Sequence, residues 1–109
     1  DEAYAAADLV VTRAGASVIS ELAFLRKPMI LIPYPLAMSH QTDNALVMSK
    51  GGAGILIEER DLSAAALGEL MLGLMRDTGR LKALGEAAAR LAVPEASDKL
   101  AAEVAALKR

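Results

Sequence analysis

The chain has 109 residues and a net charge of −2, which is enough for one small domain and gives no basic surface for nucleic acid. It contains no cysteine, so disulfides and thiolate metal sites are excluded, and only 3% of its residues are aromatic, too few for a base-stacking surface. No apolar run reaches the ~20 residues that span a bilayer. We therefore expect a single domain over residues 1–109, in a reducing compartment such as the cytoplasm and without a nucleic-acid partner.

The composition is unusually apolar for so small a domain, with 54% hydrophobic residues. The chain also opens on Asp1 instead of a methionine, inside an alanine-rich pattern that is typical of the end of a helix. We expect a part of a larger protein, whose apolar faces pack against further elements. A natural alanine-rich domain is the alternative.

The first part of the chain alternates helical patterns with short apolar segments. A helical turn, a strand, a helix, a second strand, a second helix and a third strand are predicted in that order, at residues 2–7, 9–12, 17–26, 29–32, 40–50 and 53–57. Pro28 disfavours helical backbone in the residue before it and so ends the first long helix. Gly51 and Gly52 end the second. The strand at 29–32 is continuously apolar, which is typical of a strand covered on both faces.

The remainder of the chain has a helical pattern. Three more helices are predicted, at residues 62–75, at residues 81–91 and from Pro94 onward. Asp77 and Thr78 offer a cap for the second of them. Gly68 and Gly73 weaken the first but can allow close packing. The charged segment 58–61 is more typical of a solvated turn than of a site. The element order predicts an α/β fold: a partial Rossmann-like, three-layer arrangement with about three parallel strands, right-handed crossovers and a helical C-terminal end.

A possible ligand site follows the first strand, within the segment DLVVTRAGASVISE that begins at Asp8. A turn of small residues, 13–16, leads into a helix that opens near Ser17, and Gly15 allows a backbone geometry that other residues resist. The free N–H groups and positive dipole end of such a helix suit a phosphate. Glu21 lies one turn further on and can accept hydrogen bonds from sugar hydroxyls. A tight turn without a ligand, or a capping box of Ser17 and Glu21, is the alternative.

A second polar group follows the second strand, where His40, Gln41 and Asn44 open the next helix. Because ligands of open α/β sheets bind beyond the carboxyl ends of the strands, these side chains and the Gly15 turn are expected to share a crevice. Amide and imidazole groups offer donors and acceptors, which suits sugar hydroxyls. The alternatives are a helix cap or surface residue for His40 and a solvated helix residue for Asn44. A nucleophilic triad, a metal site and a P-loop are not expected, since the sequence lacks their motifs.

Three motifs occur together in this sequence. The first, R-x-G-A, begins at Arg13 and is followed by S-E; the second, K-P, begins at Lys27 and is followed by I-P-Y-P; the third, H-Q-T-x-N-A, begins at His40. In this combination, and over nearly the whole chain, the sequence resembles the C-terminal, nucleotide-sugar-binding domain of the MurG family of GT-B glycosyltransferases. Enzymes of this family transfer N-acetylglucosamine (GlcNAc) from UDP-GlcNAc to lipid I and so form lipid II for peptidoglycan. The resemblance implies the donor-binding part of such an enzyme, with inverting transfer and UDP as the leaving group.

The resemblance also implies which residues bind UDP-GlcNAc: Ala16, Ser17, Val18, Glu21, His40, Gln41 and Asn44. The first three would hold the diphosphate through main-chain N–H groups at the helix start. The glutamate would accept hydrogen bonds from the ribose hydroxyls. His40 and Gln41 would contact GlcNAc, and Asn44 closes the same motif. No catalytic residue, metal ligand or cofactor is expected in this chain.

We expect the family's N-terminal domain and the first strands of its C-terminal domain to be absent. That N-terminal domain holds the lipid I acceptor, a membrane-facing patch and the candidate general base, so this chain alone is expected to be inactive. The parent enzyme would be peripheral on the inner face of the plasma membrane and would serve cell-wall synthesis, cell shape and cell division. An exposed sheet edge leaves room for self-association. The alternatives are another GT-B UDP-sugar glycosyltransferase, and an inactive α/β folding or engineered fragment.

Overall fold

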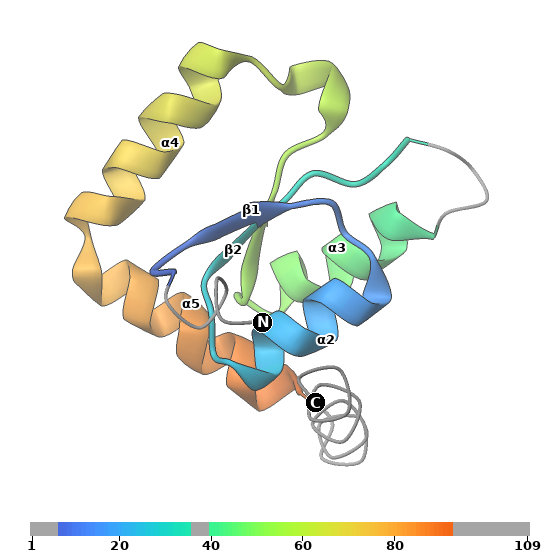
Figure 1. Cartoon of the computed structure of the whole chain (residues 1–109), viewed down its shortest axis with the longest axis vertical. Helices are drawn as coiled ribbons and strands as arrows, with labels where there is room; N and C mark the ends of the chain where they lie inside the picture. Colours follow the sequence, from blue (N-terminus) through green and yellow to red (C-terminus); the bar gives the residue numbers. More distant parts are fainter. Residues whose placement is uncertain (1–6, 36–39, 93–109) are drawn as a thin grey trace, which may run out of the picture.

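A parallel sheet lies at the centre of the computed structural model, which describes residues 7–35 and 40–92. The sheet is formed by β1 (Val10–Thr12), β2 (Met29–Leu31) and β3 (Gly54–Leu56), in the spatial order β1-β2-β3 (Figure 1). The predicted α/β class with three parallel strands is confirmed.

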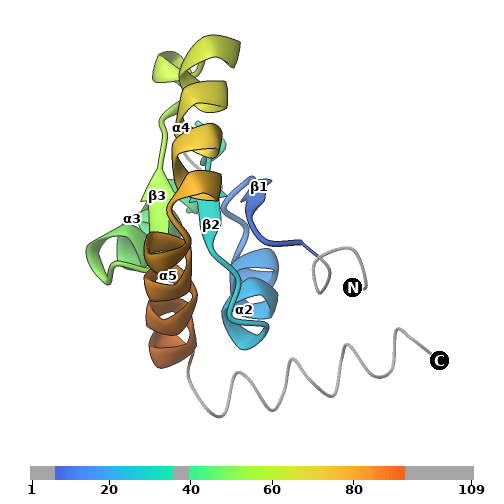
Figure 2. The ribbon, with the colours of Figure 1, turned by 90° about the vertical axis from the view of Figure 1, so that its left-hand side faces the viewer.

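Helices follow the strands. α2 (Ala16–Phe24) comes after β1, and α3 (Gln41–Lys50) comes after β2. A short 3-10 turn, η1 (Glu59–Asp61), follows β3 and leads into α4 (Ala64–Arg76) and α5 (Thr78–Leu91). In Figure 1, α2 and α3 run side by side and begin at the same end of the sheet. Figure 2 shows α4 alongside the strands and α5 below them, next to α2.

Most predicted elements are found, with ends shifted by at most three residues. The helix predicted from Pro94, and almost all of the helical turn predicted at 2–7, lie outside the described residues. The charged segment 58–61 forms η1, so part of it has regular structure.

Apolar side chains cover both faces of β2. Met29 and Leu31 pack with residues of α2, α3 and α5 on one face, whereas Ile30 packs with Leu74 of α4 and Leu84 of α5 on the other. All three β2 residues are 0% exposed. The burial predicted from the continuous apolar run is confirmed, because successive side chains of a strand point to opposite faces and both faces are covered.

Gly54 in β3 lets α3 lie close to the sheet. A Cβ atom at this position would lie 3.2 Å from Cγ of Met29 and 3.4 Å from Cβ of Met48, which belongs to α3. Because glycine has no side chain, Met48 can pack towards β2 across this position.

α2 and α3 end in the same backbone motif. In each helix a Schellman arrangement joins the N–H of the second residue beyond the C-cap to a carbonyl of the last turn, over 2.9 Å. The left-handed residue of the motif is Gly52 in α3 (φ 75°) and Arg26 in α2 (φ 57°). The predicted Gly51-Gly52 terminator is confirmed. Arg26 was expected to be the last helical residue, but its left-handed backbone ends α2 at Phe24.

Glycines play different parts in the two long helices. A Cβ at Gly85 in α5 would overlap with the carbonyl oxygen of Arg26, so glycine is required where α5 passes the end of α2. Around Gly68 and Gly73 in α4, no heavy atom of the described residues lies within 4 Å of such a Cβ. The expectation that these two glycines allow close packing is therefore wrong for this part of the chain.

Candidate functional site

The first N–H groups of α2 lie at the turn that follows β1. The first helical bond runs from the N–H of Ile19 to the carbonyl of Gly15 (3.0 Å), so the N–H groups of residues 16–18 precede the helical ladder. Gly15 is the N-cap residue and brings no capping side chain, and the first turn contains no acid. Ala16 and Ser17 are exposed. This helix start can therefore receive an anion.

Two local expectations about this turn are wrong. Gly15 has φ −66° and ψ 143°, an extended conformation that any residue adopts, so the glycine is not needed for an unusual backbone. The alternative in which Ser17 caps α2 is also wrong, because α2 begins at Ala16 and Ser17 lies inside the helix. What Gly15 contributes is the lack of a side chain beside the N–H groups.

Glu21 lies one turn beyond Ser17 in α2 and is half-buried. Residues four apart share a face of a helix, so this carboxylate lies on the same side of α2 as the helix start. A carboxylate in this place can accept hydrogen bonds from hydroxyl groups of a ligand whose anionic part lies at the N-terminus.

Gln41 and Asn44, both in the first turn of α3, bind the backbone of Ala14. The Oε1 atom of Gln41 accepts hydrogen bonds from the N–H of Ala14 (3.2 Å) and from the N–H of Tyr34 (2.8 Å). The Nδ2 atom of Asn44 donates to the carbonyl of Ala14 (3.1 Å). Two predicted site residues of α3 thus lie against the turn that precedes α2, as the shared edge of the sheet led us to expect.

His40 occupies the N-cap position of α3. Its backbone is left-handed, with φ 56°, and its side chain is exposed and makes no capping hydrogen bond. The capping alternative is therefore wrong for the side chain. The position directly before Gln41 places His40 at the same edge of the sheet as the α2 start.

Arg13 also lies at this edge of the sheet, although it was not predicted as a site residue. Its Nη2 atom lies 2.6 Å from Oε1 of Glu59, and its Nη1 atom donates to the carbonyl of Ile32 over 3.5 Å. Its Cζ atom lies 4.7 Å from the centroid of the Tyr34 ring. One side chain thus connects the carboxyl ends of all three strands. The sequence signal for Arg13 was a cation directly after a strand, in a turn whose other residues are small. Glu59 was assigned to a solvated turn, but its side chain is 40% exposed and forms an ion pair with Arg13.

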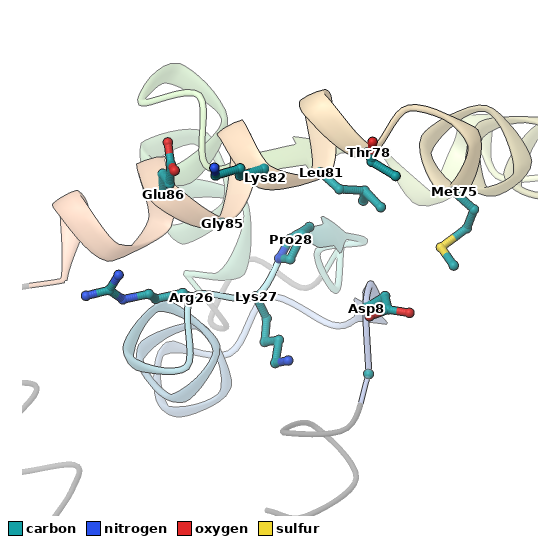
Figure 3. A pocket seen from close by; sticks show the side chains of 11 residues that line it. Asp8, Arg26, Lys27, Pro28, Met75, Thr78, Leu81, Lys82, Gly85 and Glu86 are labelled. Carbon is teal, nitrogen blue, oxygen red and sulfur yellow. The ribbon is translucent and has the colours of Figure 1, made fainter.

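Two pockets lie at opposite edges of the sheet. A pocket of about 270 Å³ at the carboxyl edge is lined by Pro33, Pro35 and Thr42 and by residues 58–60. A larger one of about 480 Å³ lies at the amino edge, where Lys82 and Glu86 of α5 stand opposite the segment 26–28 (Figure 3). The smaller pocket lies beside the candidate site, because its lining includes Thr42, which follows Gln41 in α3.

Neither a metal site nor a membrane span is found in residues 7–35 and 40–92. No group of three or more His, Cys, Asp or Glu residues there could hold a metal ion, and no helix there is long and apolar enough to cross a bilayer.

Comparison with known proteins decides the family. Residues 1–100 match the model of the glycosyltransferase family 28 C-terminal domain. The chain belongs to this family. Among curated relatives, it is 48% identical over 94% of its length to the UDP-N-acetylglucosamine--N-acetylmuramyl-(pentapeptide) pyrophosphoryl-undecaprenol N-acetylglucosamine transferase of Chlorobium luteolum. It is 47% identical over 96% of its length to the protein of the same name from Porphyromonas gingivalis.

A solved structure agrees with this family assignment. The crystal structure of Acinetobacter baumannii MurG aligns with 91% of the chain at a TM-score of 0.78 and 30% identity. The chain spans 28% of that protein and 28% of each of the two curated relatives above.

Proposed function

We propose that this chain is the donor-binding part of an inverting glycosyltransferase that moves GlcNAc from UDP-GlcNAc to lipid I in peptidoglycan synthesis. The observation that carries the proposal is the match to transferases of that name at 43–48% identity over nearly the whole chain. The uncapped start of α2 supports it, because a nucleoside diphosphate needs such an anion site.

In this proposal the diphosphate of UDP lies at the start of α2. The N–H groups of Ala16, Ser17 and Val18 donate to its oxygens, and the dipole of α2 stabilises the negative charge that develops as UDP leaves. Glu21, one turn further on, accepts hydrogen bonds from the ribose hydroxyls. No metal is needed for this stabilisation, since the charge is met by main-chain donors.

The sugar lies toward the start of α3. His40, Gln41 and Asn44 contact GlcNAc at this end of the helix, where imidazole and amide groups can pair with its hydroxyls. The general base and the lipid I site belong to another domain of the whole enzyme, so the chain by itself is expected to bind the donor without transferring GlcNAc. The whole enzyme would work at the inner face of the plasma membrane, where its lipid acceptor lies.

Titration calorimetry with UDP and UDP-GlcNAc tests this function. Glu21→Ala is expected to weaken UDP binding about tenfold or more, because a hydrogen-bonded carboxylate is lost. Glu69→Ala, which removes an exposed acid of α4, is the control and should bind like the wild type. Equal affinity of Glu21→Ala and wild type would contradict the ribose assignment.

Two further outcomes would replace the proposal. Tighter binding of another UDP-sugar than of UDP-GlcNAc would indicate a different GT-B glycosyltransferase. A chain that unfolds cooperatively but binds neither nucleotide would be an inactive α/β fragment.

We also propose self-association through the outer edges of the sheet. β1 and β3 each have one neighbour strand within the described residues, and an open strand edge can pair with another chain. Sedimentation equilibrium of the same samples should show a dimer, and a monomer throughout the concentration range of the titrations would contradict this.

A further inference from the structure

Ala14 is the point at which α3 holds the turn that precedes α2. The residue is 0% exposed, so its N–H and carbonyl groups depend on partners within the protein. Both partners are side chains of α3: Gln41 accepts from the N–H (3.2 Å), and Asn44 donates to the carbonyl (3.1 Å).

The polarity of the backbone fixes the orientation of both amides. An N–H group requires an acceptor, so the oxygen of Gln41 must face Ala14, and a carbonyl requires a donor, so the nitrogen of Asn44 must face it. Gln41 and Asn44 are three residues apart and share a face of α3, which allows both to reach a single residue. The same Gln41 oxygen accepts from the N–H of Tyr34 (2.8 Å) and thereby joins the loop after β2 to the turn after β1.

We propose that Gln41 and Asn44 are positioning residues for the diphosphate end of the donor. Ala14 lies two residues before the start of α2, so the two amides that hold its peptide groups also fix where the N–H groups of residues 16–18 point. The inference rests on the proposed donor site and deepens it: the same two side chains that border the sugar set the geometry of the phosphate site. Binding of the nucleotide, and not only of the sugar, therefore depends on them.

Comparing the affinities for UDP and for UDP-GlcNAc tests the positioning role of Gln41 and Asn44. Asn44→Ala and Gln41→Met should each weaken binding of UDP about five- to tenfold and of UDP-GlcNAc by at least that factor, measured by calorimetry well below the melting temperature. Asp43→Asn, which changes an exposed side chain of the same helix turn, is the control and should leave both affinities unchanged. A loss confined to UDP-GlcNAc would assign the pair to the sugar alone and overturn the inference while leaving the proposed function in place.

Amide hydrogen exchange gives a second readout that needs no ligand. Gln41→Met should speed exchange at the N–H groups of Ala14 and Tyr34, whereas the N–H of Ile19 in the helical ladder stays protected. Gln41→Glu retains an acceptor oxygen and should keep Ala14 protected. Unchanged exchange at Ala14 in Gln41→Met would overturn the inference. If wild-type protein binds neither nucleotide, the proposed function and the donor role of the pair fall together.

Discussion

The two edges of the sheet are held together by different forces. At the carboxyl edge, side chains bind backbone groups across the turns: Gln41 and Asn44 hold Ala14, and Arg13 reaches Ile32 and Glu59. At the amino edge, α5 lies directly against the end of α2, at a contact so close that only glycine fits at position 85. Side-chain hydrogen bonds thus cross the turns at the carboxyl edge, whereas the contact between α5 and α2 at the amino edge is steric.

Because of this difference, we expect changes at the carboxyl edge to act mainly on ligand binding and changes at the amino edge to act mainly on the stability of the fold. Hydrogen bonds at the carboxyl edge orient groups that a ligand would meet, so their loss should alter binding at a modest cost to the fold. Steric fit at the amino edge concerns only the packing of α5, so its disruption should destabilise the fold without altering the site.

Gly85→Ala should give the largest loss of stability. The new methyl group would overlap with the Arg26 carbonyl oxygen, and we expect the free energy of unfolding to fall by about 2–3 kcal/mol. Urea denaturation measures the change. The affinity for UDP at a temperature where the protein remains folded should be unchanged.

Gly73→Ala is the matched control, since it makes the same chemical change in open space. It should raise the free energy of unfolding by about 0.5–1 kcal/mol, because alanine is the better helix former. If Gly85→Ala proves as stabilising as Gly73→Ala, the steric account of the amino edge is wrong.

Arg13→Ala should have a smaller effect on stability and a clearer one on binding. It removes an ion pair whose partners are 42% and 40% exposed, together with the contact to the Tyr34 ring, so we expect a loss of about 1 kcal/mol. Because the ion pair is exposed, part of this loss should disappear at high salt. UDP affinity should fall about threefold through the neighbouring Ala14.

The control for Arg13 is Arg60→Ala. Arg60 also pairs with acids, but it is 80% exposed and its partners Glu58 and Asp61 are its own near neighbours. Its removal should not change the free energy of unfolding measurably. Equal effects of the two variants would show that the links made by Arg13 between strand ends have no special role.

The smallest effect is expected at the end of α2. Arg26→Gly should raise the free energy of unfolding by about 0.5 kcal/mol, since relief of the left-handed strain exceeds the entropy cost of glycine. Arg26→Ala keeps the strain and serves as the reference in thermal denaturation. Lower stability of Arg26→Gly than of Arg26→Ala would contradict this account.

Features carried by local pattern could be predicted from the sequence. The apolar run of β2 predicted burial on both faces, and Gly51-Gly52 predicted the end of α3, because each depends on residues next to one another. The long-range polar contacts could not be predicted, since Arg13 and Glu59 are 46 residues apart and Ala14 and Asn44 are 30 apart. Their pairing depends on how the helices cross the sheet.

At the start of α2, too, one feature could be predicted from the sequence and another could not. Anion-binding potential at α2 followed from the small-residue turn, but the roles of Gly15 and Ser17 did not, because the N-cap lies two residues before Ser17, at Gly15. Which ligand groups the seven predicted residues contact stays a prediction.

Gly54 has a consequence for any attempt to alter donor choice. Met48 packs toward Gly54, and Asn44 lies one turn earlier on the same face of α3, so the depth at which α3 sits also sets the reach of Asn44. A methyl group at position 54 would lie 3.2 Å from Cγ of Met29 and 3.4 Å from Cβ of Met48, so its neighbours would have to give by a few tenths of an ångström. A larger side chain would require more movement of α3, so this strand position bears on the reach of Asn44 into the turn.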